Sequence, residues 1–164
     1  MNLVVEDLVQ RFPVRATATR PAGMATVLDR LALATGEIST LVLVGPSGGG
    51  KSTLLRILAG LDVPTSGRVS FDGVPLPTEE EPLRCYRRTV GTVFQAYNLF
   101  PHLTAMENLL LPLVHVHGLS ESAARERVSG PLERFQLAEH AHKRPAELSG
   151  GQKQRATLAR ALIM

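Results

Sequence analysis

An α/β fold is predicted by three adjacent features in the first half of the 164-residue sequence. Residues 41–44 form a continuous apolar run, Leu-Val-Leu-Val, as in a strand that is buried on both faces of a parallel sheet. Residues 45–53 read Gly-Pro-Ser-Gly-Gly-Gly-Lys-Ser-Thr, and the apolar residues of 54–59 suit a helix packed on that sheet. A glycine loop that joins a buried strand to a helix is the context in which the G-x-x-x-x-G-K-[ST] pattern binds phosphate.

The glycine loop suits the chemistry of a phosphate group. Glycines let consecutive backbone N–H groups curl around an anion, because no side chain blocks the concave nest. The following helix adds unpaired N–H groups and the positive end of its dipole. We expect Lys51 to reach the β- and γ-phosphates and Ser52 to place its hydroxyl on Mg²⁺. The predicted nucleotide-phosphate site comprises Gly45, Pro46, Ser47, Gly48, Gly49, Gly50, Lys51, Ser52 and Thr53.

Short antiparallel strands are predicted around the strand that precedes the glycine loop. Residues 3–12 and 27–33 read as strands, and residues 13–23 between them read as a mobile loop rich in Thr, Ala, Arg, Pro and Gly. Residues 69–71 alternate in polarity before an Asp-Gly pair at 72–73, which is typical of a tight hairpin turn. The first part of the chain is therefore expected to contain an antiparallel sheet.

Two side chains outside the glycine loop are candidates for contact with a nucleotide. Phe12 ends the first predicted strand, where its ring could stack on a purine base or serve as an ordinary edge or core residue. Residues 89–94 alternate like a strand and place Gln95 at its carboxyl end, where ligands gather in open α/β sheets. The amide of Gln95 could reach a γ-phosphate, Mg²⁺ or an attacking water, or it could be a satisfied surface group.

The character of the sequence changes to helical over residues 96–147. Residues 104–107 have the spacing of a capping box ahead of an apolar stretch, and Ser120 precedes a charged surface helix. Pro131 suits the first turn of a further helix after a break at Gly130.

A last helix is predicted to begin within residues 148–152, Leu-Ser-Gly-Gly-Gln. Ser149 and Gln152 match a capping box, which by itself predicts only a well-capped helix. The pair Gly150 and Gly151 weakens the first turn by about 1 kcal/mol per residue relative to alanine. The glycines would leave a bare, positive helix end open to an anion, which favours an anion-binding role.

Composition and length place few further limits on function. The length fits one domain, and a net charge of +3 with mixed signs indicates neither nucleic acid nor an anionic membrane as a partner. Cys85 is the only cysteine, which excludes an internal disulfide and fits a reducing compartment. The sequence shows no signal peptide and no apolar stretch long enough to span a bilayer. Any link to a membrane would therefore run through a partner protein.

The glycine loop, Gln95 and the Leu-Ser-Gly-Gly-Gln motif together resemble the nucleotide-binding domain of ATP-binding cassette (ABC) transporters. The resemblance implies an α/β fold with a P-loop NTPase core, in which an antiparallel β subdomain precedes an inserted helical subdomain. It further implies a single incomplete domain over residues 1–164, with the β subdomain and P-loop core in 1–95, the helical subdomain in 96–147 and the signature helix in 148–164.

The resemblance also implies a role for each motif. The glycine loop would be the Walker A motif that binds ATP, and Lys51 within it would act in catalysis. Gln95 would be the catalytic glutamine of the Q-loop and would share Mg²⁺ with Ser52, while Phe12 would stack on adenine. The signature motif would cap the γ-phosphate held by a second copy of the domain in a head-to-tail dimer, and it comprises Leu148, Ser149, Gly150, Gly151 and Gln152.

In the complete protein the resemblance implies an ATPase that couples ATP binding and hydrolysis to solute transport. Its partners would be a second nucleotide-binding subunit, transmembrane permease subunits that dock in a groove after Gln95, and a solute-binding protein, with no nucleic acid. This would place the chain in the cytoplasm, on the inner face of the cell membrane.

Two groups of residues resemble different branches of the family. Residues 94–104 are most similar to polar amino-acid uptake ATPases, whereas residues 107–113 and 145–148 resemble lipoprotein-release and macrolide-efflux ATPases. We therefore expect amino-acid import. The alternatives are lipoprotein release or efflux, a soluble ABC protein that acts on nucleic acid or ribosomes, and a non-catalytic truncated remnant.

The sequence ends at Met164, inside the signature helix. In the resembled family the Walker B aspartate, the catalytic glutamate and a switch histidine follow that helix. We therefore expect this chain to lack the C-terminal part of the core and to turn over no ATP alone. Without the Walker B strand, residues 41–44 are expected to have no sheet neighbour and to leave apolar surface exposed.

Overall fold

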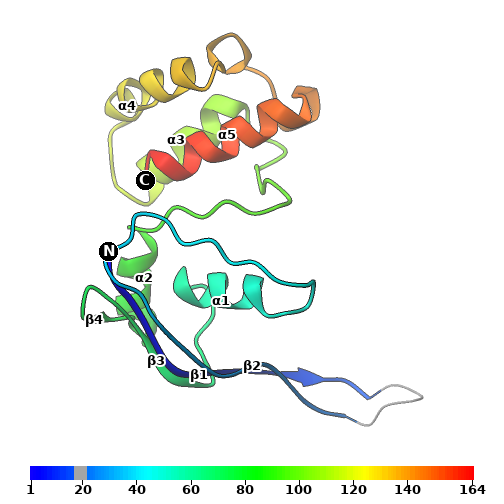
Figure 1. Cartoon of the computed structure of the whole chain (residues 1–164). Helices are drawn as coiled ribbons and strands as arrows, with labels where there is room; N and C mark the ends of the chain where they lie inside the picture. The colour runs from blue at the N-terminus through cyan, green and yellow to red at the C-terminus, as the bar shows by residue number, and fades with distance from the viewer. Residues whose placement is uncertain (17–21) are drawn as a thin grey trace. The chain divides into compact units, whose positions relative to one another are not determined.

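The computed structural model describes residues 1–16 and 22–164. The chain divides into two compact units, Met1–Arg87 and Arg88–Met164, each with its own hydrophobic core (Figure 1). Segment 88–95, which the sequence placed with the first part of the chain, belongs to the second unit. Across the described residues, no helix combines the length and the apolar character needed to cross a membrane.

The first unit contains an antiparallel sheet with the strand order β2-β1-β3-β4. Its strands are β1 (Leu3–Val14), β2 (Gly23–Ala34), β3 (Ser66–Phe71) and β4 (Val74–Pro75). The strands predicted at 3–12, 27–33 and 69–71 are confirmed, and so is the hairpin turn, in which Asp72 (φ 50°) and Gly73 (φ 78°) are both left-handed. The loop expected over 13–23 is shorter, because β1 continues to Val14 and β2 begins at Gly23. Residues 17–21 of that loop lie outside the described residues.

Helix α1 (Lys51–Leu58) packs on this sheet through Leu54 and Ile57. Its C-terminal end is held by a second helix, α2 (Glu80–Arg87). The Tyr86 hydroxyl donates to the Leu58 carbonyl (2.6 Å), and Arg87 Nε donates to the Gly60 carbonyl (2.7 Å). Burial raises the pKa of Tyr86. The core between the sheet and α1 comprises Leu3, Val5, Leu8, Leu28, Leu54, Ile57 and Val69.

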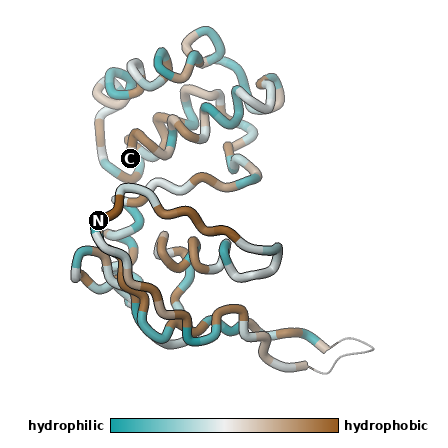
Figure 2. The backbone as a smooth tube through the Cα atoms, viewed as in Figure 1, coloured by the Kyte–Doolittle hydropathy of each residue, from teal (hydrophilic) through white to brown (hydrophobic). Residues whose placement is uncertain are grey.

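The strand predicted at residues 41–44 is not formed, which corrects the sequence prediction. The segment is extended and apolar, as the brown run before the glycine loop in Figure 2 shows. Val42 is 73% exposed and Val44 is 90% exposed. A strand needs a neighbour to pair its backbone N–H and C=O groups, and no described segment pairs with this one. The expectation that residues 41–44 lack a sheet neighbour and expose apolar surface is confirmed in the described part of the chain.

The second unit is built from three helices and two short 3₁₀ turns. These are α3 (Ala105–His115), α4 (Glu121–Arg134), the turns Ala138–His140 and Pro145–Glu147, and α5 (Gly150–Leu162). The helix starts predicted after Thr104 and Ser120 are confirmed, with a capping box at Thr104 and Glu107 and a serine cap at Ser120. The backbone N–H of Thr104 donates to Glu107 and lowers the pKa of that carboxyl. The helices enclose a core of Leu109, Leu110, Leu113, Ala124, Val128, Leu132, Leu137, Ala156, Ala159 and Ile163.

Two further predictions in this unit are wrong. Helix α4 does not break at Gly130, and Pro131 lies inside it rather than at the start of a new helix. The helix stays continuous because Val128 and Leu132, on either side of the proline, are buried in the same core. Residues 89–94 form no strand in the described chain, because no neighbouring strand pairs with them.

Candidate functional site

The glycine loop ends at a close contact with the sheet. Gly50 caps α1 in a left-handed conformation (φ 77°), without a side-chain cap. A Cβ atom at Gly50 would lie 2.7 Å from the Leu28 Cδ2 and 3.0 Å from the Val27 carbonyl oxygen. Gly48 is also left-handed (φ 79°), but open space surrounds it. Gly50 is therefore required by both conformation and packing, while Gly48 is required by conformation alone.

The Lys51 side chain folds back over the loop that precedes it. Its ammonium donates to the carbonyls of Gly45 (2.8 Å) and Pro46 (2.6 Å), which leaves one of its three N–H groups for another acceptor. The N–H of Gly49 donates to the Pro46 carbonyl at 3.3 Å, so the loop closes on itself. A cation is thus held beside the start of a helix.

The first turn of α1 is open to an anion. It carries no acidic side chain, and its first N–H groups have no partner within the helix. Ser52 and the loop residues before Gly50 are exposed, whereas Thr53 is half-buried. Positive charge, free N–H donors and an exposed hydroxyl therefore occur together, which is the donor set that a nucleotide phosphate and its Mg²⁺ require.

Phe12 lies on β1 opposite Ala25 and is 37% exposed. Two residues earlier on the same strand, Gln10 pairs with Leu28, the residue that contacts Gly50. The phenylalanine is therefore about 7 Å along the strand from the register position at which the loop meets the sheet. Its ring is accessible enough for stacking.

Gln95 is exposed and opens an irregular turn in the second unit. Tyr97 (φ 61°) and Asn98 (φ 50°) follow it in left-handed conformations. Their carbonyls are hydrogen-bonded by Thr157 and Arg160 of α5. Sequence reasoning missed these contacts, since the bonded residues are 60 to 63 positions apart.

The start of α5 is built as predicted. Ser149 Oγ accepts from the Gln152 N–H (3.3 Å), and Gln152 Oε1 accepts from the Ser149 N–H (2.8 Å). Leu148 is buried just before the helix, while Gly150 and Gly151 are exposed. A Cβ on either glycine would meet no atom closer than 3.9 Å. The local fold therefore does not require glycine at these two positions.

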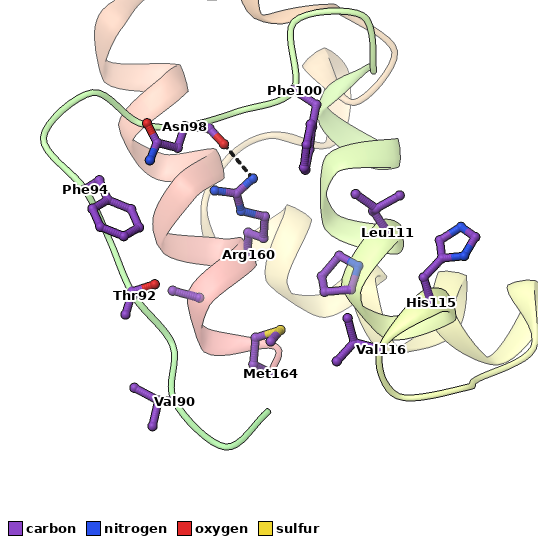
Figure 3. A pocket seen from close by; sticks show the side chains of 12 residues that line it. Val90, Thr92, Phe94, Asn98, Phe100, Leu111, His115, Val116, Arg160 and Met164 are labelled. Carbon is purple, nitrogen blue, oxygen red and sulfur yellow. Dashed lines mark hydrogen bonds between the residues drawn. The ribbon is translucent and has the colours of Figure 1, made fainter. Parts of the chain in front are cut away.

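A mainly apolar pocket of about 460 Å³ lies within the second unit (Figure 3). Arg160 reaches into it, and burial lowers the pKa of this guanidinium. The pocket is open to solvent. Its lining residues are Val90, Thr92, Phe94, Asn98, Phe100, Leu111, Pro112, His115, Val116, Arg160, Ala161 and Met164.

A glycine loop between an extended apolar segment and a helix, followed by a helical unit, defines an α/β P-loop protein. Comparison with known proteins identifies the family. The family described as ABC transporter matches residues 28–164, and the chain belongs to this family. Its α/β ABC-cassette fold is confirmed by solved structures. The dimeric structure of MJ0796, a bacterial ABC transporter cassette, aligns with a TM-score of 0.83 at 34% identity, over 98% of this chain and 69% of that one.

Relatives of this chain are named for different solutes, and some are named for none. An uncharacterized ABC transporter ATP-binding protein of Mycobacterium bovis is 43% identical over 99% of this chain and 48% of its own length. The arginine transport ATP-binding protein ArtP of Escherichia coli is 48% identical over 76% of this chain and 53% of its own. The spermidine/putrescine import ATP-binding protein PotA of Nitrosomonas europaea is 45% identical over 88% of this chain and 39% of its own length. The chain thus spans about half the length of the curated relatives it matches.

Proposed function

We propose that the chain binds Mg·ATP through its glycine loop and is the ATP-binding part of an ABC transporter that couples ATP binding and hydrolysis to solute transport. The observation that carries this proposal is Lys51, whose ammonium is held over the open N-terminus of α1 by Gly45 and Pro46. In this function Lys51 contacts the β- and γ-phosphates, and the loop N–H groups bind the remaining phosphate oxygens.

Mg²⁺ fits the residues present, because hard cations of this size take oxygen ligands and usually share them with nucleotide phosphates. The Ser52 hydroxyl would hold it together with the Gln95 amide oxygen. The ion would neutralise charge that develops on the transferred phosphoryl group. Phe12 would stack on the adenine, for which its exposed ring is suited.

The signature motif would serve a second nucleotide-binding subunit in a head-to-tail dimer. Gly150 and Gly151 are exposed and are not needed by the local fold, which supports a role in letting another molecule approach the helix end. The solved ATP-binding cassette MJ0796 is a dimer in a post-hydrolysis state bound to ADP and Pi. Such pairing would place an ATP phosphate against the positive end of α5.

The pocket of the second unit would receive a segment of a transmembrane permease subunit, and the chain would work at the cytoplasmic face of the membrane. Its mainly apolar lining around one half-buried arginine suits an amphipathic segment. Amino-acid import is the proposed activity, with a solute-binding protein as a further partner. The name of ArtP supports it, while the name of PotA makes polyamine import the competing solute class.

Isothermal titration calorimetry of the chain with Mg·ATP tests the proposal. Lys51→Ala should weaken binding about 10–100-fold, as expected for loss of a charge-assisted hydrogen bond. Lys143→Ala is a matched control, because it removes the same charge from the second unit. Equal ATP affinity in the Lys51→Ala and Lys143→Ala variants would refute the assigned role of the loop.

A further inference from the structure

The turn after Gln95 is held in an unfavourable backbone conformation. Tyr97 and Asn98 are the only two consecutive non-glycine residues with positive φ in the described chain. Asparagine tolerates this region, but a tyrosine rarely adopts it, because its Cβ crowds the backbone. Within the turn, the Tyr97 N–H donates to the Phe94 carbonyl (3.1 Å), and the Asn98 N–H donates to Ala96 (2.6 Å). Such a conformation persists only where surrounding groups hold it in place.

The groups that hold this turn come from α5. Arg160 Nη1 donates to the Asn98 carbonyl (2.9 Å), as Figure 3 shows. Arg160 Nη2 donates to the Tyr97 carbonyl (3.4 Å). Thr157 Oγ1 also lies within hydrogen-bond distance of the Tyr97 carbonyl (3.1 Å), but its single proton is shared with the Lys153 carbonyl (2.9 Å). Arg160 therefore supplies most of the donors, and only its planar fork can reach both carbonyls.

Arg160 has no carboxylate partner among the described residues. Its guanidinium is half-buried beside apolar side chains such as Phe94 and Leu111. Removing a charged group from water is unfavourable unless hydrogen bonds compensate it. The Arg160 guanidinium is compensated by hydrogen bonds to two backbone carbonyls of one turn, so its favourable placement depends on that turn.

We propose that Arg160 is a positioning residue for Gln95. By holding the carbonyls of Tyr97 and Asn98, it keeps the turn left-handed and so fixes the direction in which the chain presents Gln95 to the nucleotide. The clamp also ties Gln95 to α5, the helix that begins with the signature motif, so that the two move together. This inference rests on the proposed function, in which Gln95 contacts Mg²⁺ or the γ-phosphate.

Amide hydrogen exchange in the full chain, without nucleotide, tests the clamp itself. Arg160→Ala should accelerate exchange at the Tyr97 and Asn98 amides by about tenfold or more, because local opening becomes easier. Arg160→Lys should show most of the same effect, since an ammonium cannot bridge two carbonyls as a fork does. Arg127→Ala, an exposed arginine of α4, is the matched control and should leave exchange unchanged.

Exchange at the Asn108 amide of α3, which donates to the Thr104 carbonyl, serves as the folding reference. Acceleration confined to Tyr97 and Asn98 supports the clamp. Unchanged exchange at these two amides overturns it. Equal acceleration at Asn108 also overturns it, because Arg160 would then only support the fold of the whole unit.

The role toward Gln95 is tested by the ratio of Mg·ATP to Mg·ADP affinity, measured by calorimetry. Only ATP carries the γ-phosphate, so Arg160→Ala and Gln95→Ala should each lower this ratio about tenfold. The double variant should lower it no further than either single variant. An unchanged ratio, or fully additive losses, refutes the positioning role. If the unsubstituted chain binds neither nucleotide, the proposed function itself fails; if it binds both and only the Arg160 results disagree, the inference alone fails.

Discussion

Helices α1 and α5 both begin in glycine-rich sequence, α1 after Gly50 and α5 with Gly150 and Gly151. At α1 the glycine is left-handed, packed against β2 and without a side-chain cap. At α5 a serine and a glutamine form a complete capping box, and the two glycines are helical and uncrowded. The first helix start is made by its glycine, whereas the second is made by its caps.

This difference separates two reasons for glycine in a binding motif. Gly50 is needed so that the loop can form at all, because both its φ and its contact with Leu28 exclude a side chain. Gly150 and Gly151 satisfy no such local need, which agrees with the proposal that another molecule approaches this helix end. The comparison predicts opposite signs for the same substitution at the two helix starts.

The largest effect is expected from Gly50→Ala. Left-handed strain and overpacking against Leu28 and the Val27 carbonyl should together lower the free energy of unfolding of the first unit by about 2–4 kcal/mol. Gly48→Ala is the matched control, because it adds the strain without a close contact and should cost about 1–2 kcal/mol. Denaturant unfolding measures both values. Equal losses would show that packing against β2 contributes nothing.

A smaller loss of stability is expected at the C-terminal end of α1, where Arg56 and Asp62 form an ion pair. Arg56 donates to both carboxylate oxygens of Asp62 (2.7 Å each), and this hydrogen bonding lowers the pKa of Asp62. Asp62→Asn should cost about 0.5–1 kcal/mol at pH 7, since Arg56 is half-exposed to solvent.

The sign of the pH dependence follows from the lowered pKa. The stabilisation is fully present above the unfolded value of about 3.9 and is lost as pH falls through the lower folded pKa. The difference in unfolding free energy between the unsubstituted chain and Asp62→Asn should therefore shrink below about pH 4. A difference that stays constant from pH 7 to pH 3 would rule out the ion pair as its source.

The smallest effect, with the opposite sign, is expected from Gly150→Ala. Alanine is the better helix former and meets only the Tyr97 hydroxyl at 3.9 Å, so the second unit should gain about 0.5 kcal/mol. Thermal unfolding monitored by circular dichroism measures this gain. Destabilisation by alanine would mean that glycine at this helix start serves the fold after all.

The parts of the fold that sequence predicted are those set by local chemistry. The capping boxes at Thr104 and Ser149 and the turn at Asp72 each depend on residues three or fewer positions apart. The prediction of a strand at 41–44 was wrong because apolar composition does not supply a neighbouring strand. The prediction of a new helix at Pro131 was wrong because buried residues on both sides of the proline keep α4 continuous.

The candidate site divides in the same way. The glycine loop and Lys51 could be identified from a contiguous pattern, and the Lys51 contacts stay within six residues of it. The Arg160 clamp could not, because its partners are more than 60 residues away and it bonds to backbone carbonyls, which every sequence contains. Side-chain contacts to distant backbone carbonyls therefore cannot be predicted from a pattern of residue types.

In the proposed function, the unpaired run at residues 41–44 would link nucleotide binding to sheet formation. Because no strand among the described residues pairs with this backbone, binding a phosphate at Gly45 would also restrict the residues that lead into the loop. Any strand that pairs with the run takes over this ordering and raises the affinity of the loop for nucleotide. The coupling is reciprocal, so bound nucleotide strengthens the strand pairing by the same factor. The three exposed residues of the run, Leu41, Val42 and Val44, would thereby make nucleotide affinity a measure of whether the run is paired.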